Sequence, residues 1–344
     1  MKIIQFIPSL KGRGAERVCI DLHEGFLRAG YDSKIYITHN IVEFPIDKKY
    51  VEYIEAANME ATILQEDFDL LIGHMTHAAK VLRNIKKDPR IFFVIHTTIS
   101  AKLKKMSWKA RIIEYLKLQL IYRGAKVVTV SDWVRKDLSL LKIKPSYVKT
   151  IYNPFDFKRI ELLAKTSIDQ DSSYIIAVGG LEPVKRYDLL LRAYASLQPK
   201  ESLLILGMGS EERKLRALAD RLGISHRVQW LGWVENPYKY IKRAKLFVQT
   251  SDIEGLPGVV IESLILNTPV VATDCPSGIR EIIPKELSGY LAKVGDYEDI
   301  AGKMKQALDQ YPPIEREKLE KFRLEVNVAK YLELMQEEKI SREN

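Results

Sequence analysis

The segment Lys245–Thr273, KLFVQTSDIEGLPGVVIESLILNTPVVAT, contains two short apolar runs separated by a loop and a helix-length stretch. Leu246 to Val248 and Pro269 to Ala272 are typical of buried strands. Between them, a loop rich in Gly and Pro leads into the apolar run from Val259 to Leu266, which is long enough for a short helix. A strand, a helix and a second strand in this order form a βαβ unit, so we expect a parallel sheet.

Two glutamates stand out in this unit. Glu262 lies inside the apolar helical segment, where we expect it to be buried and therefore to need a partner. Glu254 follows the first strand and should lie at the carboxyl edge of the sheet, where α/β proteins bind ligands. The same loop leads into a helix N-terminus, whose free N–H groups favour phosphate. Because carboxylates accept hydrogen bonds from sugar hydroxyls, the pattern predicts a nucleotide-sugar site.

The run EGLPGVVIE, from Glu254 to Glu262, resembles the E-x7-E signature of glycosyltransferase family 4, retaining enzymes of the GT-B fold. Two glutamates at this spacing are common by chance, and the flanking strands and loop carry the resemblance. It implies that Glu254 contacts the donor sugar, as a catalytic residue, and that Glu262 holds the nucleotide ribose. Residues between them are expected in the same donor site: Gly255, Leu256, Gly258 and Val259.

Length and composition restrict the possible classes of protein. The chain has 344 residues, enough for two domains of roughly 150 to 200 residues each, and its 46% hydrophobic and 29% charged content is that of a globular protein. No apolar run approaches the roughly 20 residues of a membrane span, so we expect a cytoplasmic protein. Its two cysteines form no disulfide framework or metal cluster. The net charge of +9 favours an anionic partner: nucleic acid, an acidic membrane or a phosphorylated substrate.

The N-terminal half reads as a doubly wound α/β domain. Strands are expected at residues 1–8, 34–38, 70–73, 91–95 and 126–130. Gly12 and Gly14, followed by Ala-Glu-Arg, resemble the family's glycine-containing loop after the first strand, which approaches the donor diphosphate and the acceptor. This loop lacks the third glycine and the acidic residue of a dinucleotide fingerprint, which argues against a dehydrogenase.

Histidines follow two of these strands. His74 and His77 come after one strand, and His96 ends the run FFVIH, at the edge that should face the ligand. A histidine at the end of a strand is often structural, but the resemblance implies that His96 touches the donor sugar, and we predict a catalytic role for it. The Asp67–Asp69 pair forms a D-x-D pattern, yet it precedes its strand and should lie at the opposite edge. We therefore expect no metal and no other cofactor.

The region from 101 to 126 is the most basic part of the chain. Its cations are Lys102, Lys104, Lys105, Lys109, Arg111, Lys117, Arg123 and Lys126, against the single acid Glu114. Lys102, Lys105 and Lys109 recur at helical spacing. Two interpretations fit: the solvated face of a core helix, or a surface helix that lies on anionic lipid. Family members that glycosylate lipid-linked acceptors carry such patches in this domain, which favours the membrane.

Asn153-Pro154 favours a turn and resembles the family's interdomain segment. We expect an acceptor-binding domain over residues 1–153, a nucleotide-sugar domain over 154–313, and a terminal helix over 314–344 that packs on the first domain. An apolar stripe is predicted on this helix: Phe322, Val326, Ala329, Tyr331 and Leu334.

Gly179 to Lys185, GGLEPVK, resembles the family's G-R-L-x-x-x-K motif, in which the Arg and Lys clamp the donor diphosphate. Lys185 is present and is predicted to be catalytic, since a cation there stabilises the leaving diphosphate. Gly180 stands where the family has Arg, and the adjacent Arg186 could substitute for it. Val234, in the run GWV, resembles the loop that seats the base through backbone atoms.

Together these features predict an α/β protein of GT-B fold, with two doubly wound Rossmann-like domains facing each other across a cleft. The predicted function is a retaining glycosyltransferase that moves a sugar from a nucleotide sugar, with UDP as the expected nucleotide, to a glycan or lipid-linked acceptor. The setting is expected to be lipopolysaccharide, capsule or related polysaccharide synthesis at the cytoplasmic face of the inner membrane. A catalytically weak nucleotide-sugar-binding protein is the alternative, because of Gly180. A nucleic-acid binder is disfavoured, since no recognition helix or aromatic-basic motif is found.

Overall fold

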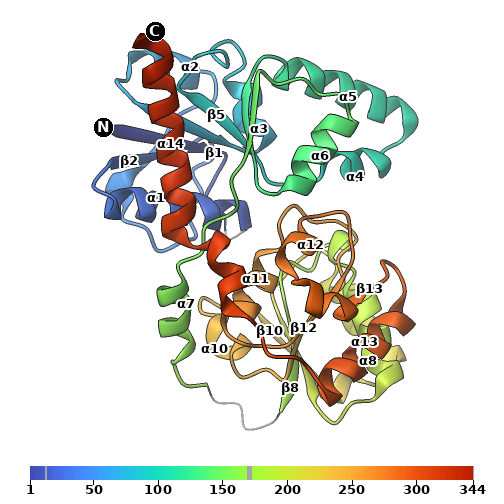
Figure 1. Ribbon diagram of the computed structural model, residues 1–344. Helices are drawn as coiled ribbons and strands as arrows, with labels where there is room; N and C mark the ends of the chain where they lie inside the picture. The colour runs from blue at the N-terminus through green and yellow to red at the C-terminus, as the bar shows by residue number, and fades with distance from the viewer. Residues whose placement is uncertain (12–13, 169–172, 344) are drawn as a thin grey trace. The chain divides into compact units, whose positions relative to one another are not determined.

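The computed structural model describes residues 1–11, 14–168 and 173–343 of the chain. It divides into two compact units, one formed by Met1–Asp156 with Lys321–Asn344 and the other by Phe157–Glu320 (Figure 1). The expected boundaries after residues 153 and 313 lie a few residues before these divisions. The terminal helix belongs to the first unit.

The first unit is built around a parallel sheet. Within its described residues this sheet has seven strands in the order β3-β2-β1-β4-β5-β6-β7. The strands are β1 (Lys2–Ile7), β2 (Asp32–Ile37), β3 (Val51–Tyr53), β4 (Leu70–His74), β5 (Ile91–Ile95), β6 (Lys126–Thr129) and β7 (Tyr147–Thr150). The central strands are apolar on both faces, as in β5, where every residue of IFFVI is buried. This is typical of a parallel sheet covered by helices on both sides.

The covering segments of the first unit are α1 (Gly14–Arg28), η1 (Lys48–Tyr50), α2 (Met59–Gln65), α3 (Met75–Val81), α4 (Ile99–Lys104), α5 (Trp108–Tyr122), α6 (Asp132–Leu140) and α14 (Leu324–Glu343). The 3₁₀ turn η5 (Arg316–Phe322) leads into α14. Two backbone hydrogen bonds tie the entry of this last segment to the end of the sheet domain: Phe155 N donates to Phe322 O at 2.9 Å, and Leu324 N donates to Phe155 O at 2.9 Å.

Helix α14 packs against α1, and the two run side by side in Figure 1. Gly25 of α1 makes this close approach possible, because a Cβ there would lie 2.5 Å from Val328 Cγ2. The predicted apolar stripe is wrong in part, since Val326 and Ala329 are exposed. The residues that are buried are Phe322, Leu324, Asn327, Val328, Tyr331, Leu334 and Met335. A polar residue marks the buried face: Asn327 Nδ2 donates to the carbonyls of Lys321 and Arg323.

The second unit repeats the same architecture. In its described part the sheet has six strands in the order β10-β9-β8-β11-β12-β13. These are β8 (Tyr174–Val178), β9 (Ser202–Leu206), β10 (Val228–Gly232), β11 (Leu246–Gln249), β12 (Val270–Thr273) and β13 (Leu291–Ala292). The helices are α7 (Phe157–Ala164), η2 (Pro183–Lys185), α8 (Tyr187–Leu197), α9 (Glu212–Arg221), η3 (Ser225–Arg227), α10 (Tyr238–Ile241), α11 (Gly258–Ile265), α12 (Ile279–Ile282), η4 (Lys285–Tyr290) and α13 (Tyr297–Asp309).

In both sheets the chain order reverses at one point. The reversal falls between β1 and β4 in the first unit and between β8 and β11 in the second. Ligands of doubly wound sheets bind beyond the carboxyl ends of the strands at such a switch point. The loops after these four strands are therefore candidate ligand-binding loops. The strand orders also confirm the predicted α/β architecture with two doubly wound sheets.

Candidate functional site

The loops that follow β8 and β11 bring two of the predicted catalytic residues together. Lys185 ends η2 in the first loop, Glu254 lies in the second, and Lys185 Nζ is 2.6 Å from Glu254 Oε1. Adjacent parallel strands end at the same sheet edge, so residues far apart in sequence meet there. The lysine side chain is about one-third exposed and the glutamate less so, which leaves this pair open to solvent and to a ligand.

Polar residues that no sequence motif predicted hold this pair in place. Glu254 Oε1 also accepts hydrogen bonds from Ser251 Oγ at 2.7 Å and Gln249 Nε2 at 3.2 Å. Thr250 is buried, and its hydroxyl contacts the carbonyl oxygens of Lys185 and Arg186, each at 2.9 Å. The loop carrying Lys185 is thus fastened to the strand that positions Glu254. The pattern Gln-Thr-Ser at the end of an apolar strand is the signal that could have identified these residues.

Arg186 occupies a different environment from Lys185. Its backbone is left-handed, with φ 51° and ψ 43°, where the chain passes from η2 into α8. The guanidinium contacts Asp188 at 2.9 Å and Asp252 at 3.2 Å, and the hydrogen bond to Asp188 raises the pKa of Arg186. Two carboxylates therefore hold this cation.

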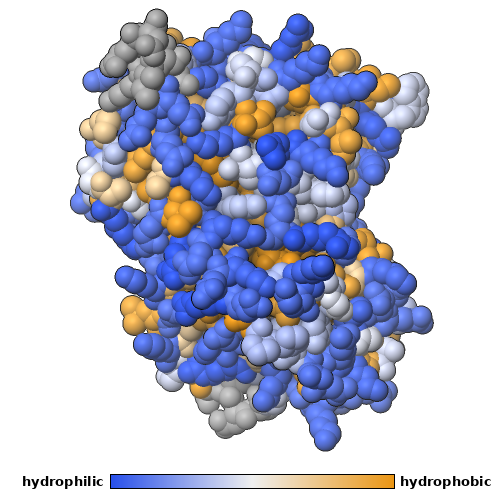
Figure 2. Space-filling model, in the orientation of Figure 1, coloured by the Kyte–Doolittle hydropathy of each residue, from blue (hydrophilic) through white to orange (hydrophobic). Residues whose placement is uncertain are grey.

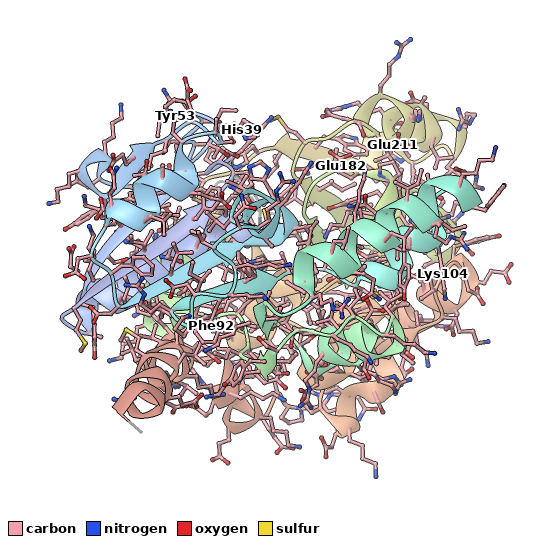
Figure 3. The ribbon with its side chains drawn as sticks, turned by 90° about the horizontal axis from the view of Figure 1, so that it is seen from above. His39, Tyr53, Phe92, Lys104, Glu182 and Glu211 are labelled. Carbon is pink, nitrogen blue, oxygen red and sulfur yellow. The ribbon has the colours of Figure 1, made fainter. Side chains whose placement is uncertain are left out.

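Gly180, in the position of the family's arginine, lies in open surroundings. A Cβ built on it would meet its nearest neighbours, Glu182 Cγ and Met208 O, at 3.7 and 3.8 Å, which is ordinary van der Waals contact. Its neighbours are packed much more tightly. Leu181 N donates to Met208 O at 3.0 Å, and Glu211 N donates to Leu181 O at 2.9 Å. Figure 3 shows Glu182 and Glu211 next to each other on these two joined loops.

Helix α11 begins directly after the Glu254 loop. Its N-cap is Pro257, so no side chain caps the first N–H groups. Gly258, Val259 and Glu262 are partly exposed and lie on one face, whereas the other side chains up to Ile265 are buried. The expectation that Glu262 is buried is wrong: helical spacing places it with Gly258 and Val259 on the partly exposed face of this apolar helix. Its Oε1 accepts a hydrogen bond from Tyr238 Oη at 3.2 Å.

The remaining predicted donor residues of this unit lie in the neighbouring loops. Val234 is partly exposed after β10, while Gly255 and Leu256 are buried. The carbonyl of Gly255 accepts a hydrogen bond from Gly278 N at 2.8 Å, which fastens the Glu254 loop to the turn before α12. Lys185, Val234 and Glu254 thus lie in the loops after β8, β10 and β11, at the carboxyl edge of one sheet, and Glu262 lies in α11, which follows the last of these loops.

In the first unit, His96 follows β5 at the carboxyl edge of its sheet. Its Nε2 lies 3.1 Å from His74 Nδ1, and burial lowers the pKa of His96 to about 4. Gly14 is the first residue of α1, and nothing lies within 4 Å of a Cβ built on it. Gly12 lies outside the described residues. Asp69 Oδ2 accepts a hydrogen bond from Lys2 N at 2.8 Å, so the D-x-D pattern lies at the amino edge of the sheet.

The basic region forms two helices rather than one. Helix α4 ends at Lys104 and α5 starts at Trp108, so the predicted helical spacing of Lys102, Lys105 and Lys109 is wrong. The turn at Lys105 to Ser107 interrupts it. Only Leu118 and Tyr122 of α5 are buried, so α5 lies on the surface of its unit.

Apolar residues of α5 are exposed along one face of the helix. They are Trp108, Ile112, Ile113, Leu116 and Leu120, each at least half exposed. At about 100° per residue they cover an arc of about 140°, with Lys109 inside it and Lys117 at its margin. Figure 2 shows orange side chains among blue ones over this helix, and Figure 3 places Lys104 beside it. No helix in the described part of the chain is long and apolar enough to cross a bilayer.

Two family models match the chain. The model for glycosyl transferases group 1 matches residues 158–323, and that for glycosyltransferase family 4 matches residues 12–159. Among relatives, the chain is 27% identical over 332 residues to the N-acetylgalactosamine-N,N'-diacetylbacillosaminyl-diphospho-undecaprenol 4-alpha-N-acetylgalactosaminyltransferase of Campylobacter jejuni. That alignment covers 88% of this chain and 89% of the relative.

Two further similarities concern a second relative and a solved structure. The chain is 28% identical over 187 residues to the lipopolysaccharide 1,6-galactosyltransferase of Salmonella typhimurium, covering 53% of this chain and 52% of that protein. The crystal structure of HepE from Anabaena in complex with UDP superposes with a TM-score of 0.74. It covers 100% of both chains at 18% identity, a likeness that concerns the fold.

Proposed function

Because this chain belongs to the group 1 and family 4 glycosyltransferases of GT-B fold, we propose that it transfers a sugar from a UDP-sugar to a lipid-linked glycan, with retention of the anomeric configuration. The observation that carries this proposal is the Lys185–Glu254 pair at the switch point of the second sheet, beside the uncapped start of α11. The names of two relatives support the acceptor class, a diphospho-undecaprenol glycan in one and lipopolysaccharide in the other.

In the proposed reaction the second unit binds the donor. The N–H groups at the start of α11 and the Lys185 ammonium attract the diphosphate. Glu254 accepts hydrogen bonds from hydroxyls of the sugar, and Glu262 accepts them from the ribose. The bond from the sugar's anomeric carbon to the diphosphate breaks as the bond to the acceptor oxygen forms, and the leaving diphosphate takes up the acceptor's hydroxyl proton. Negative charge grows on the diphosphate during this step, and Lys185 stabilises it. The protein thus contributes mainly position and electrostatic stabilisation.

A panel of nucleotides and nucleotide sugars tests the donor assignment. A ligand that binds the native state raises its melting temperature, so UDP and UDP-sugars should give the largest shifts. Transfer to a diphospho-polyprenol glycan, followed by NMR of the new linkage, then tests acceptor and stereochemistry. An inverted linkage would contradict retention, and shifts with GDP- or ADP-sugars alone would contradict the UDP assignment.

We expect Glu262→Ala to weaken UDP binding by about ten- to hundredfold, the range for losing a hydrogen bond to a charged group. The fold should persist, because Glu262 is partly exposed. Titration calorimetry with UDP and with the UDP-sugar should show the same loss, since the ribose is common to both. Glu298→Ala, an exposed glutamate on α13, is the matched control. Equal affinities for UDP in the Glu262 variant and the wild type would remove Glu262 from the site.

Turnover is expected to need no divalent metal. The position of the D-x-D carboxylates supports this expectation, because they lie at the amino edge of the first sheet, beside Lys2, and not at the carboxyl edge where ligands bind. Lys185 supplies the positive charge that a metal gives to other transferases. Transfer measured in EDTA should therefore match transfer in buffer. A loss of activity in EDTA that Mg²⁺ or Mn²⁺ restores would contradict this expectation.

We also propose that α5 lies on an anionic bilayer. Its exposed apolar face suits the boundary between headgroups and acyl chains, and the surrounding lysines suit anionic headgroups. A lipid-linked acceptor is embedded in such a surface, so binding there would bring enzyme and acceptor together. Exposed apolar residues at this density also argue against an ordinary solvated face.

Each basic residue near an anionic surface contributes about 1 kcal/mol to binding, so binding to vesicles of anionic lipid should be measurable. This binding should weaken as the salt concentration increases, because salt screens the charges. Lys109→Glu with Lys117→Glu should abolish it. Ile112→Gln with Leu116→Gln should weaken it even at low salt, because apolar contact is lost. Leu162→Gln, which changes a leucine of α7 that is at least as exposed as Ile112 and Leu116, is the control. Co-sedimentation that is the same for both double variants and the wild type would make α5 an ordinary surface helix.

A further inference from the structure

Three polar side chains form a hydrogen-bonded line across the central strands of the first unit. Gln5 lies in β1, His74 ends β4, and His96 follows β5, and these strands are neighbours in the sheet. Gln5 and His74 are completely buried. Gln5 Oε1 lies 3.0 Å from His74 Nε2, and His74 Nδ1 lies 3.1 Å from His96 Nε2.

The chemistry of these atoms fixes the direction of each hydrogen bond. Gln5 Nε2 contacts the backbone carbonyl of Cys19 at 3.0 Å, and a carbonyl can only accept, so the amide nitrogen must face Cys19. The amide oxygen then faces His74 and requires a proton on His74 Nε2. A neutral imidazole carries one N–H, so His74 Nδ1 accepts from His96 Nε2–H.

Both imidazoles are held neutral by their surroundings, as this order requires. Burial lowers the pKa of His74 well below its ordinary value, and the neighbouring His96 lowers it further. Burial alone lowers the pKa of His96. The backbone directly after His74 is also unusual: Met75 has φ 69°, a left-handed conformation that few residues other than glycine adopt. Such strain persists where the surrounding structure requires it.

We infer that Gln5 and His74 are positioning residues that fix His96 as the Nε2–H tautomer, with its Nδ1 presented as a hydrogen-bond acceptor for a substrate hydroxyl. Among the described residues, His96 hydrogen-bonds through Nε2 alone. A lone pair on Nδ1 accepts from a sugar hydroxyl but has no proton to give to a diphosphate oxygen. Resting on the proposed function, this assigns His96 to the sugar rather than to the phosphate part of the reactants.

Long-range ¹H–¹⁵N spectra of the full-length protein test the tautomer directly, with the His96 signals assigned from their loss in His96→Asn. The expected result is a proton on Nε2 of both His74 and His96. In Gln5→Met the acceptor that orients His74 is gone, so both rings should become mixtures of tautomers. His23, a buried histidine whose Nδ1 lies 2.9 Å from Ser33 Oγ, is the internal control and should not change.

A proton on His96 Nδ1 in the wild type would overturn the inference. The wild-type spectrum alone tests the tautomer, so the test remains valid even if Gln5→Met does not fold. An unchanged His96 tautomer in a folded Gln5→Met would also overturn the role of Gln5. Transfer by Gln5→Met should fall about five- to tenfold, as for the loss of one hydrogen bond. UDP affinity should stay constant, because its proposed contacts lie in the second unit. If the wild-type protein transferred no sugar, the proposed function would be overturned. The tautomer of His96 would still be measured, because the NMR spectrum does not depend on transfer.

Discussion

Lys185→Ala should reduce the rate of sugar transfer by about 10² to 10³, the usual cost of removing a donor that stabilises charge in the transition state. Lys185 Nζ lies 2.6 Å from Glu254 Oε1 at the carboxyl edge of the second sheet. The diphosphate gains charge only as the sugar bond breaks, so the loss should fall mainly on kcat, with a smaller change in donor affinity. Steady-state kinetics with titration of UDP separate the two effects.

Two further variants show whether the charge itself is responsible. Lys185→Arg keeps a cation and should retain more activity than Lys185→Ala, although a planar guanidinium does not reproduce the ammonium contact. Lys214→Ala is the matched control, since Lys214 also pairs with a glutamate, Glu211, but lies three-quarters exposed on α9. A transfer rate that Lys185→Ala leaves unchanged would contradict the placement of the diphosphate beside this lysine.

The same comparison addresses the alternative of a catalytically weak binding protein. That alternative rests on Gly180, which stands where the family has a second cation. The structure shows that Arg186 contacts Asp188 and Asp252, so it is held by carboxylates of its own unit. Lys185 is therefore the cation we assign to the diphosphate. A weak binder would show no transfer in the wild type and no consequence of losing Lys185.

The family resemblance placed Lys185 and Glu254 in one donor site, and the strand order of the sheet explains why their side chains meet. Both residues come after apolar strands, and parallel strands place their following loops at one edge. The hydrogen bonds around them could not be predicted. Thr250 fastens the lysine loop through two carbonyl oxygens, and such bonds depend on the exact separation of two loops 65 residues apart.

Helical faces were harder to predict than helices. Glu262 is partly exposed although its helix is mostly apolar, because periodicity gives the spacing of a face but not which side the sheet covers. The stripe on α14 was wrong at Val326 and Ala329 for a related reason: the buried face includes the polar Asn327. On α5 the apolar residues face outward, which hydrophobicity alone could not show. The short strands β3, β7 and β13 were also missed, as too few residues carry their pattern.

Gly207→Ala should destabilise the second unit by about 3 kcal/mol or more, since the added Cβ would lie 2.0 Å from the carbonyl oxygen of Gly179. Its φ of 131° also disfavours any side chain. Gly207 N donates a hydrogen bond to Gly232 O at 2.6 Å, and Gly179 N donates one to Leu206 O at 2.9 Å. The loops that begin at Gly179 and Gly207 therefore cannot move apart without breaking these backbone hydrogen bonds.

The expected fall in melting temperature for Gly207→Ala is about 6 to 12 °C, from about 2 to 4 °C per kcal/mol in a domain of this size. UDP should stabilise the variant less than the wild type, because Gly179 begins the loop that carries Lys185, which we assign to the diphosphate. Gly302→Ala is the matched control: Gly302 lies inside α13, nothing is within 4 Å of its added Cβ, and alanine favours a helix. Its melting temperature should stay the same or rise slightly. Equal melting temperatures of the two variants would show that the loops after β8 and β9 can separate. That result would contradict our expectation that tight packing of these loops holds Lys185 in position.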